Sequence, residues 1–268
     1  MSIILISIFT MGLLAMFFAV VLVVANQKLK VREDPRVEEI MNALPGLNCG
    51  GCGFPGCHGL AEKIAEHGSL EGLGCPPGGQ AVADKIAAIL GIETSASVKK
   101  RAEVFCAGTR ANAADKAEYR GIKTCAAARM VDCGPKACNY GCLGFGDCAK
   151  ACPFDAIHVA ESGVAVVDIE KCTGCGICVK NCPTRIIALI PCDQDVIVKC
   201  SSKDKGAVSR KNCKVACIAC KLCEKNSPDG AFVVTGNLAS VADYKKCQQG
   251  AANTAIEKCP TKCIVKLN

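Results

Sequence analysis

The sequence is poor in the side chains from which most globular cores are built. Its 268 residues include no Trp, only three Tyr and eight Phe, and three His. Although the formal net charge is +7, the basic residues are not interleaved with stacking aromatics, which argues against a nucleic-acid-binding surface. The chain is long enough for two or three small domains, which need a source of stability other than aromatic packing.

Cysteine, by contrast, is present in large excess, at 24 of 268 residues. In a small secreted protein this would indicate a disulfide framework. Here the cysteines recur at spacings typical of metal or cluster ligands, and such ligands must be reduced thiolates. We therefore expect the cysteine-rich part of the chain to face the cytoplasm.

The clearest motif runs from Cys172 to Pro183 and reads CTGCGICVKNCP. Its first three cysteines are three positions apart and the fourth precedes a proline, as in the bacterial ferredoxin run that binds [4Fe–4S] clusters. Three thiolates on one tight loop can reach three irons of one cluster, whereas the cysteine beside the proline ligates the other cluster of a two-cluster ferredoxin. A zinc site is the alternative, but zinc normally takes two separated pairs of ligands.

An uncharged run of 23 residues, Ile3–Ala25, lies near the N-terminus. At about 1.5 Å per residue it would span roughly 35 Å, enough to cross a bilayer core of about 30 Å. The two residues before it supply no positive n-region of a cleaved signal peptide. We expect a single transmembrane anchor at residues 1–25, followed by a charged stalk or linker at 26–44.

The orientation of this anchor follows from the charges beside it. Three basic residues come directly after the apolar run, namely Lys28, Lys30 and Arg32. The positive-inside rule therefore predicts a single-pass protein of the cytoplasmic (inner) membrane, with its cysteine-rich part on the cytoplasmic side. This agrees with the argument from reduced thiols.

Residues 45–93 are predicted to form a small helical [4Fe–4S] domain. Glycine-flanked cysteines at Cys49, Cys52, Cys57 and Cys75 can close on one cluster, cluster 1, because the glycines let the backbone approach the sulfurs. Zinc remains an alternative for these four thiols. The pattern of Leu60 and Ile64 predicts an amphipathic helix between Cys57 and Cys75, and a second helix is expected over Gln80–Leu90.

A connecting region, 94–135, precedes a predicted two-cluster ferredoxin-like domain at 136–190. The cysteines of the connecting region, Cys106, Cys125 and Cys133, form no recognisable site and are interpreted as buried free thiols. In the second run, Phe145 stands where a middle cysteine is expected, and Cys138 is the available substitute. The interleaved rule of two-cluster ferredoxins then predicts two ligand sets. Cluster 2 takes Cys138, Cys142, Cys148 and Cys182, and cluster 3 takes Cys152, Cys172, Cys175 and Cys178.

The last part of the chain, 191–268, repeats the preceding part at an offset of 75 residues, which predicts a second, degenerate ferredoxin-like unit. One ligand set has lost three of its four cysteines, because Ser227, Gly250 and Asn253 stand at those positions and only Cys247 remains. The other set is intact and predicts cluster 4 on Cys217, Cys220, Cys223 and Cys259. The overall expectation is therefore an α+β chain with four [4Fe–4S] clusters. A fifth would have to use leftover cysteines such as Cys106, Cys125, Cys200 and Cys213.

Residues 199–225 carry eight basic side chains against only Asp204 and Glu224. The basic residues are Lys199, Lys203, Lys205, Arg210, Lys211, Lys214, Lys221 and Lys225. A solvated surface is one interpretation of this segment. The other is a docking patch that steers an acidic carrier protein to cluster 4.

The arrangement as a whole resembles the B subunit of the Rnf complex, a membrane ferredoxin:NAD+ oxidoreductase that couples electron flow to Na+ or H+ translocation. The resemblance covers nearly the full chain and is carried by the N-terminal anchor and by the segments NCGGCGFPGC, CPPGG, KACNYGCLGFGDCAKACPFDAI and CSSKDKG. It implies an electron-transfer protein that accepts electrons from reduced soluble ferredoxin and relays them towards NAD+. It also implies the other Rnf subunits and the membrane as partners.

Two alternatives stay open on the sequence alone. One is the iron–sulfur subunit of another membrane redox complex, such as a hydrogenase or a heterodisulfide-reductase-like enzyme. The other is a zinc-binding, cysteine-rich scaffold without redox function. The sequence has no G-x-G-x-x-G fingerprint after a strand, so the chemistry of NAD and flavin is expected on partner subunits, and no residue is predicted to act as an acid, base or nucleophile.

Overall fold

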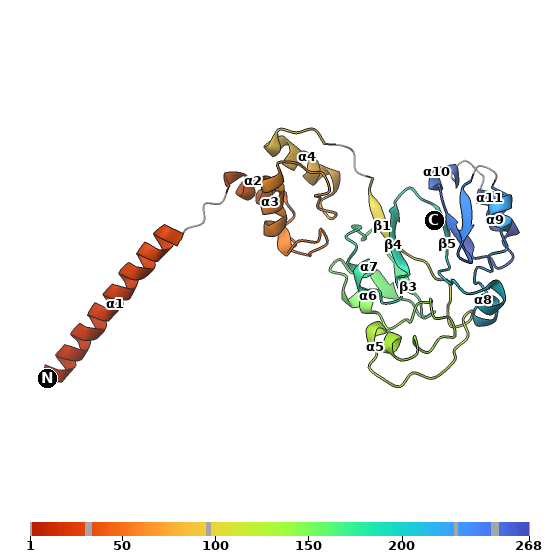
Figure 1. Ribbon diagram of the computed structural model, residues 1–268, viewed down its shortest axis with the longest axis horizontal. Coiled ribbons are helices and arrows are strands. Elements are labelled where there is room, and N and C mark those ends of the chain that lie inside the picture. The colour runs from red at the N-terminus through yellow and green to blue at the C-terminus, as the bar shows by residue number, and fades with distance from the viewer. Residues whose placement is uncertain (1, 30–33, 95–97, 228–229, 248–251, 268) are drawn as a thin grey trace.

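The computed structural model describes residues 2–29, 34–94, 98–227, 230–247 and 252–267. Three parts follow one another along the chain in Figure 1: a long N-terminal helix, a small group of helices, and a mixed region of short helices and two-stranded sheets. Four residues of the predicted anchor flank and second repeat, Lys30, Arg32, Pro228 and Gly250, lie outside the described residues.

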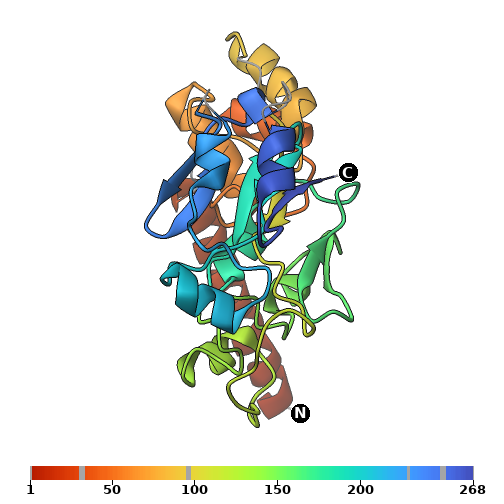
Figure 2. The same ribbon diagram turned by 90° about the vertical axis from the view of Figure 1, so that its right-hand side faces the viewer.

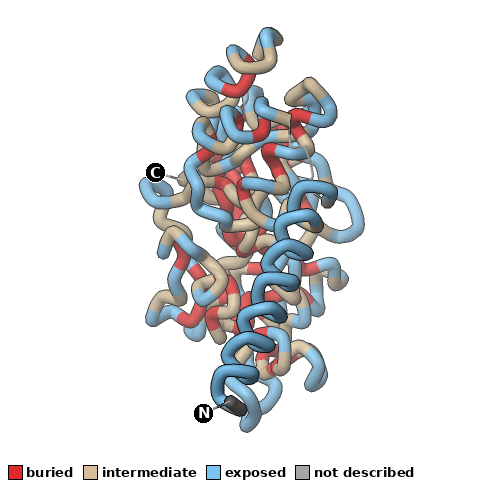
Figure 3. The backbone as a smooth tube through the Cα atoms, turned by 90° about the vertical axis from the view of Figure 1, so that its left-hand side faces the viewer, coloured by how far each residue is buried: buried red, intermediate tan, exposed pale blue. Residues whose placement is uncertain are grey.

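Helix α1 (Ser2–Leu29) contains the predicted anchor. Its segment Ile4–Lys28 is long and apolar enough to cross a membrane by length and composition, and none of its most apolar window is buried within the protein. Figure 3 shows this helix as a rod that is exposed along its length. A signal sequence would pass the same test of length and composition.

Three helices form the second part, α2 (Pro35–Ala43), α3 (Gly56–His67) and α4 (Gly79–Leu90). Their apolar faces meet in one small core, to which α2 contributes Ile40, α3 contributes Leu60 and Ile64, and α4 contributes Ile86. The helices expected between Cys57 and Cys75 and over Gln80–Leu90 are thus confirmed. Because Ile40 is completely buried, the helix at the end of the predicted stalk belongs to this core.

The third part contains two units with the same order of strands. The first unit has β1 (Lys100–Val104), α5 (Cys125–Met130), α6 (Asp147–Lys150), β2 (Ile157–Val159), β3 (Ala165–Val167), α7 (Ile177–Asn181) and β4 (Ile187–Pro191). The second has β5 (Val196–Val198), α8 (Gly206–Asn212), α9 (Leu222–Lys225), β6 (Phe232–Thr235), β7 (Leu238–Val241), α10 (Tyr244–Lys246), α11 (Ala252–Lys258) and β8 (Ile264–Lys266). The mixture of helices and antiparallel pairs agrees with the predicted α+β class.

Each unit pairs its first strand with its last and closes a hairpin between them. Strand β1 pairs antiparallel with β4, and β5 pairs antiparallel with β8. The inner hairpins are β2–β3 and β6–β7, and the second of these faces the viewer in Figure 2. Strand β5 of the second unit is therefore the counterpart of β1.

The segment after β1 joins the two units. The backbone N–H of Ala107 donates to the carbonyl of Lys199 at 3.0 Å, and Ala114 donates to Asn212 at 2.9 Å. Ala113 and Cys213 form an isolated antiparallel bridge beside these bonds. Residues of the predicted connecting region therefore lie against the start of the second unit and hold the two units together.

Candidate functional site

Four groups of cysteines surround four separate cavities in the two units, and each group is named here after one of its members. The Cys172 cavity is lined by Cys152, Cys172, Cys175 and Cys178; the Cys125 cavity by Cys125, Cys142, Cys148 and Cys182; the Cys217 cavity by Cys217, Cys220, Cys223, Cys259 and Cys263; and the Cys106 cavity by Cys106, Cys138, Cys200 and Cys213. The cavities are similar in size, at about 320–370 Å³.

The Cys172 cavity brings together the four residues expected for cluster 3. Backbone N–H groups donate to two of the sulfurs, from Ala102 to Cys172 and from Ala156 to Cys152, each at 3.4 Å. The loop between the ligands runs very close to β1: Gly174 has φ +70°, and a Cβ added there would collide with the carbonyl oxygen of Lys100. Only glycine allows this approach of loop to strand.

The Cys125 cavity contains three of the four residues expected for cluster 2. The fourth thiol is Cys125, at the start of α5, and not Cys138. The N-terminus of α5 is attached beside Cys148, because the backbone N–H groups of Cys125 and Ala126 each donate to the carboxylate of Asp147 at 2.9 Å. Phe145, at the position of the missing cysteine, instead packs on Tyr119, with ring centroids 5.5 Å apart.

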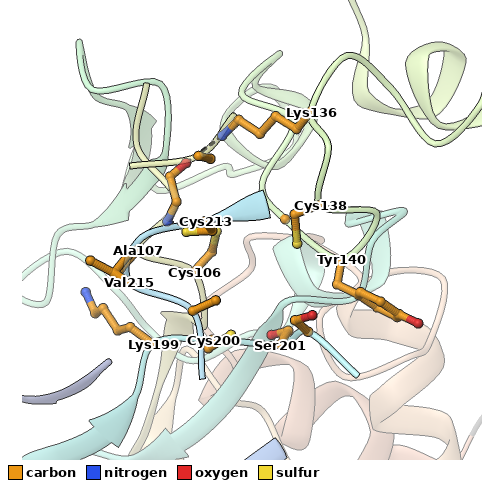
Figure 4. A pocket seen from close by; sticks show the side chains of 15 residues that line it. Cys106, Ala107, Lys136, Cys138, Tyr140, Lys199, Cys200, Ser201, Cys213 and Val215 are labelled. Carbon is orange, nitrogen blue, oxygen red and sulfur yellow. Dashed lines mark hydrogen bonds between the residues drawn. The ribbon is translucent and has the colours of Figure 1, made fainter. Parts of the chain in front are cut away.

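Cys138 lies in the Cys106 cavity together with Cys200 and Cys213. The sequence did not indicate that these three residues share a site. The ligands of this cavity come from both units, since Cys106 follows β1 and Cys200 follows β5. The prediction that Cys138 belongs to the ligands of cluster 2 therefore differs from the structure, in which the Cys138 side chain lines the Cys106 cavity. Figure 4 shows the side chains of the four cysteines around the space between the units.

The Cys217 cavity contains the four residues expected for cluster 4 and one more thiol. The sulfurs of Cys259 and Cys263 are 3.6 Å apart. Cys263 also contacts Cys217, and the single S–H that it can donate lowers the pKa of Cys259 to about 4 and also lowers the pKa of Cys217. Cys220 is the one exposed thiol among the described cysteines, so this cavity opens to the surface.

The one cysteine that remains of the lost ligand set in the second unit, Cys247, is buried in an apolar core. Cys247 belongs to one buried core with Phe232, Ala252 and Ala255. The hydroxyl of Ser227 is buried and has no hydrogen-bond partner, while Asn253 is exposed on α11. The loss of this ligand set stays a prediction, because Gly250 lies outside the described residues.

The four cysteines expected for cluster 1 lie at the surface of the helical core. Cys57 and Cys75 belong to that core or pack on it, and Cys75 interacts electrostatically with Cys49, Cys52 and Cys57. The loop that carries Cys49 and Cys52 is closed by Asn48, whose side-chain oxygen accepts a hydrogen bond from the Cys57 backbone N–H at 2.8 Å. This group, called the Cys49 group, is close to the first unit, because a Cβ added at Gly51 would lie 2.9 Å from the Cβ of Cys175.

Burial makes several of these thiols poor acids before a cofactor binds. It raises the pKa of Cys148 to about 12 and that of Cys178 and Cys223 to about 11. Because iron binds the thiolate, cofactor binding must displace these protons. A bound iron–sulfur cluster would supply the positive charge that stabilises sulfur anions in these buried places.

The arrangement of thiols fits a cluster better than a single ion. In the part of the chain that the structure describes, no three His, Cys, Asp or Glu side chains converge closely enough to hold one metal ion. Zinc would require four sulfurs at about 2.3 Å from a common centre. Four thiols on the wall of one cavity supply the number of ligands that a [4Fe–4S] cluster takes.

The family comparisons agree with this chemistry. A profile described as "Putative Fe-S cluster" matches residues 44–77, and one described as "4Fe-4S dicluster domain" matches residues 136–186. The first covers the Cys49 group, and the second covers α6, α7 and the hairpin β2–β3 of the first unit. Neither of these two profiles extends over the second unit or the segment 94–135.

Curated relatives match over almost the whole chain. The B subunit of the Na(+)-translocating ferredoxin:NAD(+) oxidoreductase complex of Acetobacterium woodii is 45% identical over 95% of this chain and 75% of its own length. The B subunit of the ion-translocating oxidoreductase complex of Methanosarcina acetivorans is 40% identical over 91% of both chains. The B subunit of the proton-translocating ferredoxin:NAD(+) oxidoreductase complex of Clostridium ljungdahlii is 39% identical over 95% of this chain and 89% of its own length. At this identity and coverage, the chain belongs to the family formed by the B subunits of ion-translocating oxidoreductase (Rnf) complexes.

Proposed function

We propose that the protein is the iron–sulfur electron-transfer subunit of a membrane-bound, ion-translocating ferredoxin:NAD+ oxidoreductase complex. The observation that carries the proposal is the succession of thiol groups through the molecule, from an exposed site in the second unit to the helical domain next to α1. The names of the relatives supply the reaction and the complex. The rival of a zinc scaffold is not favoured, because the thiols do not converge on single-ion sites in the described residues.

Four of the thiol groups would hold the four predicted clusters, with Cys125 in the place first expected for Cys138. A bound [4Fe–4S] cluster takes up and gives back one electron at a time, at a potential set by its surroundings. The chain itself holds the sulfurs, donates backbone N–H groups to them and keeps water away. We interpret the two units as bacterial-ferredoxin folds in tandem. The first comprises β1 and residues 136–190, and the second comprises residues 191–268, which include β5.

The neighbours of each group suggest the order of transfer. The Cys125 and Cys172 cavities adjoin, since Cys148 of one and Cys152 of the other are a single helical turn apart in sequence, and the thiols of both cavities meet in one core. The Cys172 cavity in turn adjoins the Cys49 group through the contact of Gly51 with Cys175. Because tunnelling slows steeply with distance, electrons would leave the first unit through the Cys49 group, towards membrane partners of the same complex.

Electrons would enter at the second unit. Of the eight basic residues at 199–225, seven are exposed, and only Lys199 is half-buried in an ion pair with Glu103, at 3.3 Å. The exposed thiol of Cys220 lies directly before Lys221 in this basic segment. A negatively charged ferredoxin would be steered to this surface and would deliver its electron to the most accessible site.

Helix α1 would anchor the protein, with the thiol groups on the cytoplasmic side of the inner membrane. Reduced thiols and the basic residues after the apolar run support this orientation. With one candidate span in the described residues, we assign ion translocation, by Na+ or H+, to partner subunits.

The test uses the complete complex purified without oxygen. Cys52→Ala should leave the clusters of the two units reducible by reduced ferredoxin, as followed by their absorbance, while NAD+ reduction stops. Cys192→Ala is the control, since Cys192 lines none of the cavities described. Undiminished NAD+ reduction in Cys52→Ala would reject the proposed order, and wild-type clusters that ferredoxin cannot reduce would reject the function.

A further inference from the structure

We propose that the Cys106 cavity is a fifth [4Fe–4S] site, held by Cys106 and Cys138 from the first unit and Cys200 and Cys213 from the second. Neither family profile covers this ligand set as a whole, because only Cys138 lies within a matched segment. The role of this site in electron transfer rests on the proposed function. The existence of the site is argued from the arrangement of its residues alone.

The four thiols are related by the internal repeat. Each unit supplies one cysteine two residues after a valine at the end of its first strand, in Val104-Phe105-Cys106 and Val198-Lys199-Cys200. Each unit also supplies one cysteine from the pattern K-x-C-x-x-x-C, in which Cys138 precedes Cys142 and Cys213 precedes Cys217. The site is therefore built twice from the same two sequence elements, as expected for a position on an approximate twofold axis between the units.

The hydrogen bonds to the sulfurs repeat in the same way. The Cys106 sulfur accepts from the backbone N–H groups of Gly108 and Cys142, both at 3.4 Å. The Cys200 sulfur accepts from the corresponding groups, those of Ser202 and Cys217.

The remaining two sulfurs each accept from the residue two positions ahead, Cys138 from Tyr140 and Cys213 from Val215. Backbone donors aimed at every sulfur of a group stabilise thiolates and cluster sulfurs, and they are not needed by neutral free thiols. These bonds indicate a built ligand site and argue against the interpretation of Cys106 as a free thiol.

The space between the thiols suits the same cofactor as the other cavities. Counting the part open to solvent, it measures about 370 Å³, against about 320–330 Å³ for the other three cavities. Much of the remaining wall is apolar, and Ala107 and Val215 lie beside the cysteines in Figure 4. The Cys106 cavity therefore resembles the other three in extent and in the number of thiols that line it.

Two lysines also line the cavity. Lys136 is 6% exposed and its ammonium group donates to the carbonyl of Gly108 at 2.7 Å, and Lys199 approaches from the second unit. A buried cation needs a nearby negative charge, and four thiolates around an iron–sulfur core supply it. In Figure 4 the two lysines lie on different sides of the four cysteines.

The position of the site explains what it would do. The backbone N–H of Cys142 donates to the Cys106 sulfur, while the Cys142 thiol lines the neighbouring Cys125 cavity. In the same way, the backbone N–H of Cys217 donates to the Cys200 sulfur, while the Cys217 thiol lines the Cys217 cavity. The site therefore lies between the place where ferredoxin is proposed to dock and the first unit. One electron would arrive from the second unit and one would leave to the first, with no bond made or broken and no proton required.

The decisive measurement is the iron and acid-labile sulfide content of the anaerobically purified full-length protein. We expect about twenty irons per chain, against about sixteen if only four cubanes are present. In Cys200→Ala and in Cys213→Ala we expect a loss of about four irons, or a three-iron signal in electron paramagnetic resonance, while the matched controls Cys133→Ala and Cys192→Ala keep the wild-type content.

A second measurement on the unmodified chain covers the case in which these variants do not fold. Thiol alkylation before and after removal of iron by a chelator should label Cys106, Cys138, Cys200 and Cys213 only afterwards, as for Cys142 and Cys217. Equal labelling of the four in both states, or sixteen irons with one zinc, would overturn the fifth cluster. Twenty irons without electron transfer from ferredoxin would keep the site and overturn the proposed function.

Discussion

The backbone N–H of Cys125 donates to the Asp147 carboxylate at 2.9 Å, and this bond places a thiol from a distant loop next to Cys148. Asp147 precedes Cys148 in the chain, so the same turn that carries one ligand also orients another. The side chain of Thr124 supports the arrangement, because it accepts a hydrogen bond from Ala127 at 3.2 Å and caps the short helix α5. A loop thereby brings a fourth thiol to the cavity beside the run in which Phe145 stands at the place of a cysteine.

The first prediction concerns this substitute ligand. Cys125→Ala should reduce the iron content by about four per chain or leave a three-iron cluster, because the Cys125 cavity would keep only three thiols. Iron analysis with electron paramagnetic resonance measures the outcome, and Cys133→Ala is the control from the same loop. A variant with full iron content and unchanged spectra would show that Cys125 is no ligand.

The second prediction concerns the negative charge beside the cavity. Asp147→Asn should keep all irons but make the potential of one cluster more positive, on the order of tens of millivolts, since a nearby carboxylate disfavours the added electron. Redox titration followed by electron paramagnetic resonance measures the shift. Asp115→Asn serves as the control, because this exposed carboxylate lines none of the cavities described. An unchanged or more negative potential in Asp147→Asn would contradict the argument.

Much of the first unit could be predicted because its signals are local. The hairpin β2–β3 follows from alternating residues around Glu161-Ser162-Gly163, and the Cys172 cavity follows from the cysteine run itself. In both cases the interacting residues are close in sequence or obey a spacing that the cluster imposes. The same holds for helix α4, whose apolar face meets the helical core through Ile86.

The ligand sets that include Cys125 and Cys138 could not be predicted in the same way. The constant offset of 75 residues pairs Cys125 with Cys200, whereas the strands pair Cys106 with Cys200. The reason is an insertion: Cys106 and Cys138 are 32 positions apart, but Cys200 and Cys213 only 13, so the first unit has 19 additional residues. This insertion carries Cys125, and only tertiary contacts show where it folds back.

A comparison of the two K-x-C-x-x-x-C patterns would have been the best available signal for the fifth site. Both Cys138 and Cys213 precede their ferredoxin run by the same interval and follow a lysine two positions earlier. The valine two residues before Cys106 and Cys200 is a weaker signal, because a valine at the end of a strand is common. Cys263 gave no signal at all, since its neighbours become visible only in the folded unit.

The third prediction separates Cys259 from Cys263. Cys259→Ala should remove about four irons, because Cys259 precedes a proline as the ferredoxin pattern requires. Cys263→Ala should keep them and make the cluster potential more negative, because it removes a thiol that donates to ligand sulfurs. Iron analysis and redox titration of the two variants measure the difference. The reverse pattern would show that Cys263 is the ligand.

The last prediction tests whether the basic segment is a docking surface. The double variant Lys221→Glu/Lys225→Glu should slow electron transfer from ferredoxin by roughly tenfold or more at low ionic strength, because electrostatic steering raises association rates by about 10- to 1,000-fold. The difference from wild type should shrink as salt is added, since the Debye length falls from about 10 Å at 0.1 M to about 3 Å at 1 M. Stopped-flow kinetics of cluster reduction over a salt series measures both effects.

Its control, matched in net charge, uses two helices of the first unit. Lys150→Glu/Lys180→Glu changes two exposed lysines on α6 and α7 and should leave the rate nearly unchanged, because both lie outside the basic segment. Equal slowing in both variants would mean that net charge alone governs the reaction. Slowing that is confined to Lys221→Glu/Lys225→Glu and lost at high salt would locate the ferredoxin at the exposed Cys220, because that thiol lies beside the two altered lysines.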